Sequence, residues 1–170
     1  MLIDCSYFTK GSRHILNATM GTADTLPNPN AEEVNNTILA YIDELQSEFL
    51  IDMLGSGLAN KVHTYLVCQE EDETPLHIES MDELCERLRE PFADYVFFHI
   101  LRDSNTQATM TGLVKLKTAN TIVAPISRQV SVWNSMVKKN RLFAEWAKES
   151  TLKGITVSAE MTTPINVLNL

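Results

Sequence analysis

Apolar residues recur every three or four positions along most of the chain, which is the spacing of an amphipathic helix. Asn30 and Glu33 have the spacing of a capping box, which predicts that the first long helix starts at Asn30. The glycines Gly55 and Gly57 predict its end. Its apolar positions are Val34, Ile38, Ile42, Leu45, Phe49 and Met53. A second, shorter helix is expected next, with apolar positions at Leu58, Val62, Tyr65 and Leu66.

A third helix is expected from Ser80, because Ser80 and Glu83 repeat the capping-box spacing. Pro91 is predicted to kink or restart this helix, since proline removes one backbone hydrogen bond. Residues 92–101 are apolar around most of the helix circumference, so we expect this helix to be the most buried one and the hub of the core. His99 is expected to pack in that core with one ring nitrogen hydrogen-bonded.

Between residues 104 and 123 the apolar pattern changes from helical spacing to alternation. The polar run SNTQATMTG, residues 104–112, disfavours a helix. The next two segments, 113–117 and 118–123, predict two short strands joined by a turn around Ala119 and Asn120. Because a lone hairpin is marginal in water, we expect the helices or a neighbouring subunit to hold it. This polar excursion is therefore predicted to contact a partner.

The carboxyl-terminal part is predicted to contain one more helix and an arm. Pro125 and Ser127 precede apolar positions with helical spacing, and the interleaved Lys138, Lys139 and Arg141 predict an exposed basic face. The apolar positions of this helix are Val130, Trp133, Val137 and Ala144. Beyond Gly154 the chain loses helical spacing and becomes β-branched, which predicts an extended arm that docks on a sheet edge or a partner groove.

These patterns predict a mainly α fold, a helical bundle of about four to five helices with a short β-hairpin excursion and an extended C-terminal arm. With 170 residues, of which 44% are hydrophobic, the chain is expected to form a single domain. Residues 1–30 would form an N-terminal segment that ends in GTADTLPNPN. Residues 31–150 would form the helical body with the hairpin at 113–123, and residues 151–170 the arm.

The charges are divided along the chain. Residues 31–90 hold 15 aspartates and glutamates against three basic residues, a net charge of −12. Residues 91–170 hold nine basic residues against five acidic ones, a net charge of +4, within a total of −8. Such asymmetry would let the acidic face of one subunit meet the basic face of the next, head to tail. A solvated acidic helix face is the plainer alternative.

The cysteines and the hydropathy of the chain indicate the redox compartment and whether the protein associates with a membrane. Cys5, Cys68 and Cys85 are odd in number and have no CxxC spacing, so neither a disulfide framework nor a thiolate metal site is expected. Buried or inert thiols in a reducing compartment are expected instead. No apolar run approaches the roughly 20 residues that span a bilayer, and the amino terminus lacks a signal-peptide pattern. We expect a soluble protein without membrane association.

The sequence contains no recognisable catalytic motif. The four histidines are scattered without an HExxH spacing, and neither GxSxG nor a glycine-rich phosphate loop is present. Acidic pairs such as Glu32 with Glu33 lie at helix starts, where they complement the helix dipole. We predict no catalytic residue, no metal site and no cofactor. Basic residues around Trp133 could contact nucleic acid, but the overall acidity argues against direct nucleic-acid binding.

The segment from residue 97 to 137 resembles a known family. The order FFHILRD, NTQ, TGLVKLK, Asn120, Pro125 and VWNSMV resembles head–tail connector, or adaptor, proteins of tailed bacteriophages and prophages. The resemblance implies a non-enzymatic virion protein made in the bacterial host cytoplasm. It also implies a homo-oligomeric ring in the neck of the virion, between the portal and the tail components.

The resemblance also implies which residues lie at contacts between subunits or with the portal. They are Arg102, Asp103, Asn105, Gln107, Lys115 and Lys117. The same residues could instead cap and brace the hairpin, and both interpretations stay open. The alternative function is a soluble acidic phage protein that binds a host protein, as a nucleic-acid mimic or as a regulator. A metal-dependent enzyme that uses isolated carboxylates is a third, weaker hypothesis.

Overall fold

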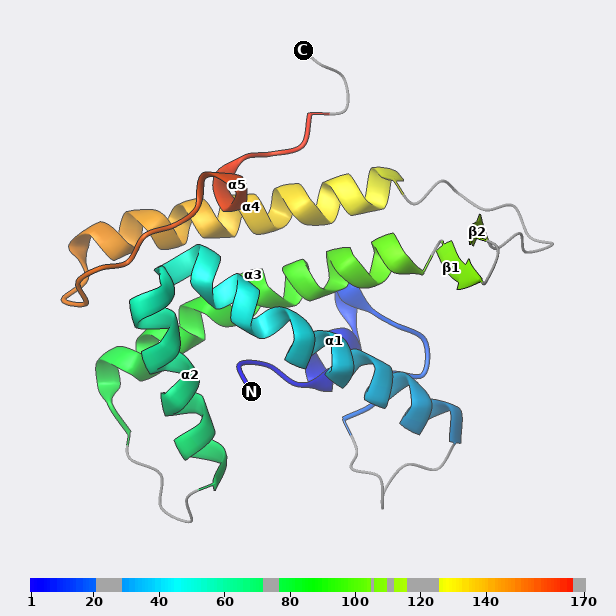
Figure 1. Ribbon diagram of the computed structural model, residues 1–170, viewed down its shortest axis with the longest axis horizontal. Coiled ribbons are helices and arrows are strands. Elements are labelled where there is room, and N and C mark those ends of the chain that lie inside the picture. Colours follow the sequence, from blue (N-terminus) through cyan, green and yellow to red (C-terminus); the bar gives the residue numbers. More distant parts are fainter. Residues whose placement is uncertain (21–28, 72–76, 105, 110–111, 116–125, 167–170) are drawn as a thin grey trace.

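The computed structural model describes residues 1–20, 29–71, 77–104, 106–109, 112–115 and 126–166 (Figure 1). The described residues are mainly helical, which confirms the predicted class. The elements are η1 (Cys5–Phe8), η2 (Gly11–Arg13), α1 (Pro29–Leu54), α2 (Ser56–Glu71), α3 (Glu79–Asp103), β1 (Thr106–Thr109), β2 (Gly112–Lys115), α4 (Ile126–Glu149) and α5 (Ala159–Thr162). The turn expected at Ala119 and Asn120 lies outside the described residues.

Both predicted capping boxes place the helix start too late. α1 begins at Pro29, so Asn30 lies inside the first turn. Proline suits a first helical position because it has no backbone N–H to leave without a partner. α3 begins at Glu79 after Ile78, which provides no side-chain cap, so Ser80 is not the cap either. The Ile78 amide instead donates to the Tyr65 hydroxyl oxygen at 3.2 Å, a partner from α2 that no local spacing reveals.

The joint between α1 and α2 lies at Gly55, as the sequence predicted. Gly55 has a φ of 76°, in the left-handed region that side chains other than glycine rarely adopt. Its amide donates to the Ile51 carbonyl at 2.8 Å, which closes α1. Its carbonyl accepts from the Ala59 amide at 3.0 Å, which opens α2. One residue therefore ends one helix and starts the next.

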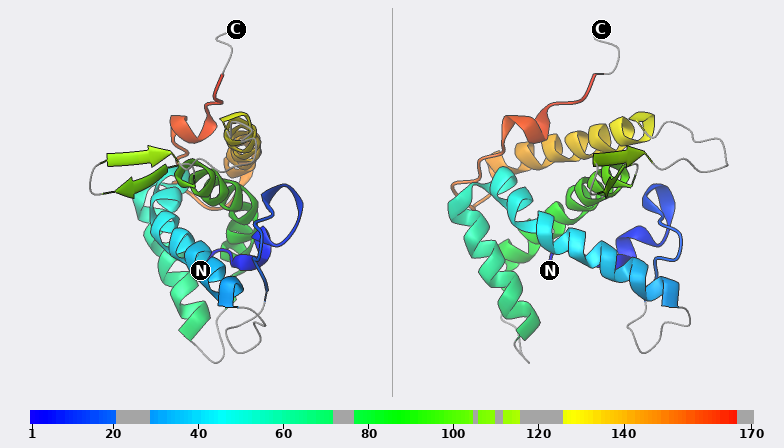
Figure 2. Two further views of the ribbon diagram at one scale, coloured as in Figure 1. Left: turned by 90° about the vertical axis from the view of Figure 1, so that its right-hand side faces the viewer. Right: turned by 45° about the vertical axis from the view of Figure 1, so that its right-hand side comes forward.

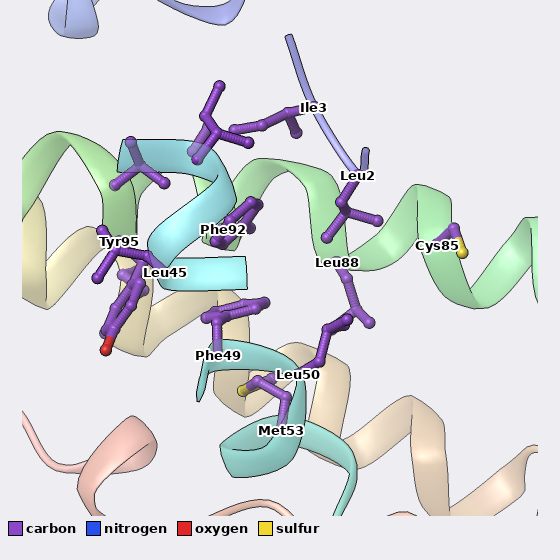
Figure 3. Close-up of a cluster of buried hydrophobic side chains, with 14 of the residues drawn as sticks. Leu2, Ile3, Leu45, Phe49, Leu50, Met53, Cys85, Leu88, Phe92 and Tyr95 are labelled. Atoms are coloured by element: carbon purple, nitrogen blue, oxygen red, sulfur yellow. The ribbon is translucent and has the colours of Figure 1, made fainter. Parts of the chain in front are cut away.

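α3 is the hub of the core, as predicted. Phe92 and Val96 are fully buried, and the Phe92 ring lies 4.9 Å from the Phe49 ring of α1, centroid to centroid (Figure 3). The helix continues through Pro91 from Glu79 to Asp103, so the alternative that Pro91 restarts it was wrong. Pro91 is itself buried, and we attribute the continuity to packing that outweighs one missing backbone hydrogen bond.

α4 packs along α3, and α3 lies between α4 and α1 (Figure 2). Trp133 and Val137 are buried as predicted, whereas Val130 and Ala144 are only half-buried. Met136, Asn140 and Phe143 are buried on this helix although the sequence did not single them out. Lys139 departs from the predicted exposed basic face, because its ammonium turns toward α3 and binds Asp94.

The N-terminal segment contributes to the same core. Leu2, Ile3 and Phe8 are buried in one cluster with the side chains of α1 and α3 (Figure 3). The Leu2 amide donates to the Gln46 side-chain oxygen of α1 at 2.6 Å. Cys5 and Cys85 are buried, and burial raises the pKa of Cys85 to about 11, which keeps that thiol protonated. Cys68 is exposed, so of the expected buried or inert thiols only Cys5 and Cys85 are buried.

The carboxyl-terminal arm is not extended throughout. After an irregular stretch it forms the short helix α5 and lies across α4 (Figure 1). Met161 of α5 is buried, with 1% of its surface exposed. The β-branched composition identified the irregular stretch, but the sequence did not reveal that Met161 would be buried where the arm folds back onto its own bundle.

The observed hairpin has a different pairing from the predicted one. β1 and β2 are antiparallel, with Thr106 opposite Lys115 and Thr109 opposite Gly112. The first predicted strand, 113–117, overlaps β2, but β2 pairs with the preceding polar run and not with the described part of any later segment. Residues 116–125 lie outside the described residues. Threonines favour strands, so the polar run was compatible with β1 although its lack of apolar alternation hid it.

Candidate functional site

The polar excursion is rooted where α3 ends and α4 begins. The Arg102 side chain donates through Nε to Asp103 Oδ1 at 2.8 Å. Asp103 Oδ2 accepts from the Tyr41 hydroxyl of α1 at 3.3 Å. The side-chain amide of Gln129 in α4 donates to the Leu101 carbonyl at 3.0 Å. These bonds join three helices at the base of the hairpin.

Arg102 and Asp103 are both charged at neutral pH and both reach solvent. The hydrogen bond from Arg102 lowers the pKa of Asp103, and the same bond raises the pKa of Arg102. The side chains are 55% and 39% exposed. Asp103 thus joins the end of α3 to α1, while bracing of the hairpin and a contact of either residue with a partner stay predictions.

The other four predicted interface residues lie in or beyond the hairpin. Gln107 lies in β1 opposite Val114, and Lys115 ends β2 opposite Thr106. The antiparallel register therefore returns the backbone of Lys115 to the end of α3, close to Asp103 in the fold. Asn105 and Lys117 lie outside the described residues.

A charged cluster around the buried Asp94, which the sequence analysis missed, ties the N-terminal segment to the bundle. Asp94 of α3 is 4% exposed and accepts from Lys139 Nζ at 2.7 Å, Arg13 Nη1 at 2.8 Å and Ser135 Oγ at 3.0 Å. Glu90 accepts from Arg13 Nη2 at 2.9 Å. Partial burial opposes its ionisation, but the hydrogen bond and charge of Arg13 lower the pKa of Glu90. A lone aspartate within the apolar run 92–101 was the available signal.

Side chains of α4 hold the arm by its backbone. Trp133 donates through its indole N–H to the Thr163 carbonyl at 3.0 Å, so this side chain both packs in the core and binds the arm. The Asn134 side chain donates to the Ile165 carbonyl at 3.1 Å and accepts from the Ile165 amide at 2.8 Å. Two further bonds run from Asn140 to the Met161 carbonyl and from Arg141 to the Thr162 carbonyl.

For His99, the hydrogen bond expected at one ring nitrogen is not made by Nδ1 within the described residues. This nitrogen is buried. Burial, together with the neighbouring charge of Arg102, lowers the pKa of His99 to about 4, so the imidazole is neutral at pH 7. No group of three or more histidine, cysteine or carboxylate side chains in the described part of the chain is placed to hold a metal ion.

No family model, no curated protein and no solved structure matches this chain. Within the described ranges, no helix is both long and apolar enough to cross a membrane. The function must therefore be argued from the excursion, the charged faces and the arm.

Proposed function

We propose that the protein is a virion structural protein, a head–tail connector or adaptor subunit that forms a ring between the portal and the tail. The observation that carries the proposal is the excursion. More than twenty residues separate the two long helices α3 and α4, and the described part of this segment includes the antiparallel hairpin of β1 and β2. A hairpin that projects from a rigid base is suited to strand addition or to insertion between neighbours.

The base of the excursion supports this role because it is well held. Asp103 bonds to Arg102 and to Tyr41 of α1, and Gln129 of α4 bonds to the last turn of α3. A force applied to the hairpin would thus be passed to three helices. Rigid elements position an interface more accurately than a free loop does.

The charges of the two outer helices support lateral contact between subunits. α1 presents exposed carboxylates that form no ion pair with any described residue: Glu32, Glu33, Asp43, Glu44 and Glu48. α4 presents exposed basic side chains, among them Lys138 and Arg141. α3 lies between these two helices, so the acidic and the basic side chains belong to helices on opposite sides of α3 (Figure 2). Head-to-tail contact of unlike faces closes into a ring when the rotation per subunit permits.

The decisive experiment is the copy number of this protein in purified particles from the source lysate, relative to the major capsid protein, by quantitative mass spectrometry. A low, fixed number consistent with one ring is expected. Absence from particles would refute the connector role and would favour the second candidate function below.

A charge-reversal variant tests the excursion. The double substitution Lys115→Glu and Lys117→Glu is expected to weaken assembly without unfolding the subunit, since it reverses two charges on a segment outside the core. Sedimentation velocity would measure assembly and circular dichroism would measure folding. Lys10→Glu with Lys153→Glu is the matched control, because both of these lysines are exposed and distant from the hairpin in sequence. Unchanged assembly in the first variant would exclude these lysines from the interface.

The second candidate function is binding of a host protein by the acidic surface, as a nucleic-acid mimic or regulator. The unpaired carboxylates of α1 favour it, since a row of exposed negative charge attracts proteins that bind a phosphate backbone. Competition with DNA for a host enzyme would be its signature. A pull-down in which no nucleic-acid-binding protein is retained would contradict it.

A further inference from the structure

A pocket of about 600 Å³ lies at the junction of α1, α3, α4 and the arm. Three aromatic rings form much of its wall: Tyr95 and Phe98 from α3 and Trp133 from α4. Met161 and Ile165 of the arm close one side. The Phe98 and Trp133 rings lie 4.9 Å apart, and Tyr95 is only 4% exposed, so this wall is well packed. Concave sites with apolar walls and few polar groups are the usual form of ligand pockets.

Three carboxylates share this pocket with the aromatic wall. Glu48 and Asp52 come from α1, and Glu160 comes from α5. None of the three forms an ion pair with a described residue. Arg102 also lines the pocket, but its guanidinium is bonded to Asp103. Burial first, and then the charge of Glu160, raise the pKa of Asp52.

A further polar side chain of the wall is the imidazole of His99. His99 lines the pocket, and its buried Nδ1 has no described partner. A neutral imidazole does not repel a cation, and in one tautomer Nδ1 accepts a hydrogen bond. Its side chain also packs on Tyr95, with ring centroids 4.5 Å apart. The wall thus combines negative charge, ring faces and a neutral acceptor.

We propose that this pocket binds an organic cation with an apolar stem, that is, an alkylammonium or alkylguanidinium group. The carboxylates would neutralise the charge, and the aromatic rings would contact both the cationic head and the stem. Such a group occurs in a lysine or arginine side chain of a neighbouring protein and in a free diamine. The inference does not depend on the connector role, because it concerns the isolated subunit.

The binding test uses Trp133 as the reporter. The substitution Trp146→Phe leaves Trp133 as the only tryptophan, since the chain has two. Titration with N-acetyl-lysine methylamide is expected to give a saturable change in fluorescence. The uncharged analogue N-acetyl-norleucine methylamide, which has the stem without the charge, is expected to give none. Equal binding of the two compounds, or no binding of either, would overturn the proposal.

Carboxylate substitutions identify the site. Asp52→Asn and Glu160→Gln are nearly isosteric and are each expected to weaken binding by about tenfold, the factor that corresponds to about 1.4 kcal/mol. Glu145→Gln is the control, because Glu145 is exposed on α4 and bonded to Lys148, outside the pocket. Thermal melts would verify that each variant is folded. Unchanged affinity in the Asp52→Asn, Glu160→Gln double variant would also overturn the proposal.

A last comparison separates the two sources of the cation. Cadaverine, a free diamine, and a short peptide with one lysine between neutral residues would be titrated in parallel. Tighter binding of the peptide would support a protein side chain as the occupant, and tighter binding of cadaverine would support a free diamine. Both outcomes support a cation pocket, which remains testable whether or not the protein is found in particles.

Discussion

The partly buried imidazole of His99 should make the stability of the fold depend on pH. Its pKa lies near 4 in the folded protein, because burial and Arg102 disfavour the charged imidazole, whereas an unfolded chain has the ordinary value of 6.5. Between these two values the unfolded state binds more protons than the folded one. Stability from this residue is therefore complete above pH 6.5 and is lost as the pH falls toward 4.

The substitution His99→Phe should remove this pH dependence. The free energy of unfolding of the parent protein is expected to drop by about 2 kcal/mol between pH 6.5 and 4 on account of His99, with an allowance for its partial exposure. Urea denaturation at a series of pH values would measure the drop. Loss of stability through Glu90 and Asp103 should begin as the pH falls through their ordinary pKa values of 4.5 and 3.8 and should continue below them, since both pKa values are lowered in the folded protein. An equal drop in the variant would contradict the assignment.

Asp94 is expected to be the most sensitive charged position. The substitution Asp94→Ala would leave Lys139 and the largely buried Arg13 with Glu90 as their remaining carboxylate partner, and should cost about 3 kcal/mol. Chemical denaturation would measure the loss. Glu145→Ala removes an exposed pair with Lys148 and should cost less than about 0.5 kcal/mol. Similar losses of stability in the two variants would show that the burial of Asp94 does not determine how much its ion pairs contribute to stability.

Single residues also show which features of the structure could be predicted from the sequence. The apolar circumference of residues 92–101 predicted the buried hub, because a helix that is buried on all sides has apolar residues on all sides. The partners of Asp94 could not be predicted, since Arg13 and Lys139 lie 81 and 45 residues away and nothing local pairs them. The same limit hid the aromatic, acidic pocket, whose walls come from four separate segments.

At the scale of elements, the α1–α2 joint depends on the conformation of one glycine. Gly55→Ala should destabilise the fold by about 1–2 kcal/mol, because a side chain disfavours a φ of 76°. Gly57→Ala is the matched control: it lies in α2 with open space around its Cβ position and should be neutral or stabilising by up to about 1 kcal/mol. Thermal or urea unfolding of both variants would reveal the difference in sign. A neutral Gly55→Ala would exclude this account.

The elements differ in how well their patterns predicted them. Long helices were recovered because three or more turns repeat the same apolar spacing, and the errors at their starts are one residue. Of the predicted hairpin only the first strand overlaps described residues, and its partner β1 was not predicted, because strands of four residues offer too few alternations to fix a partner. The fold of the arm depends on the docking of Met161, a long-range contact without a periodic signal.

At the scale of the whole molecule, the division of charge should govern assembly. If unlike faces meet, assembly should weaken as salt rises, because the screening length shrinks from about 10 Å at 0.1 M to about 3 Å at 1 M. Sedimentation velocity at increasing sodium chloride would measure the shift toward monomers. Assembly that strengthens with salt would instead indicate a mainly apolar interface.

The hydrogen bonds from α4 side chains to the backbone of residues 161–165 have a consequence for how the sequence of the arm can evolve. α4 contacts carbonyls and one amide of residues 161–165, and these groups are the same in nearly every amino acid. The side chains at exposed positions such as Thr163 can therefore change without loss of these bonds. Proline in place of Ile165 would remove the backbone N–H that donates to the Asn134 side-chain oxygen. Selection on the arm would act through Met161 and through the backbone, so related chains could keep this architecture while their arms show little residue identity.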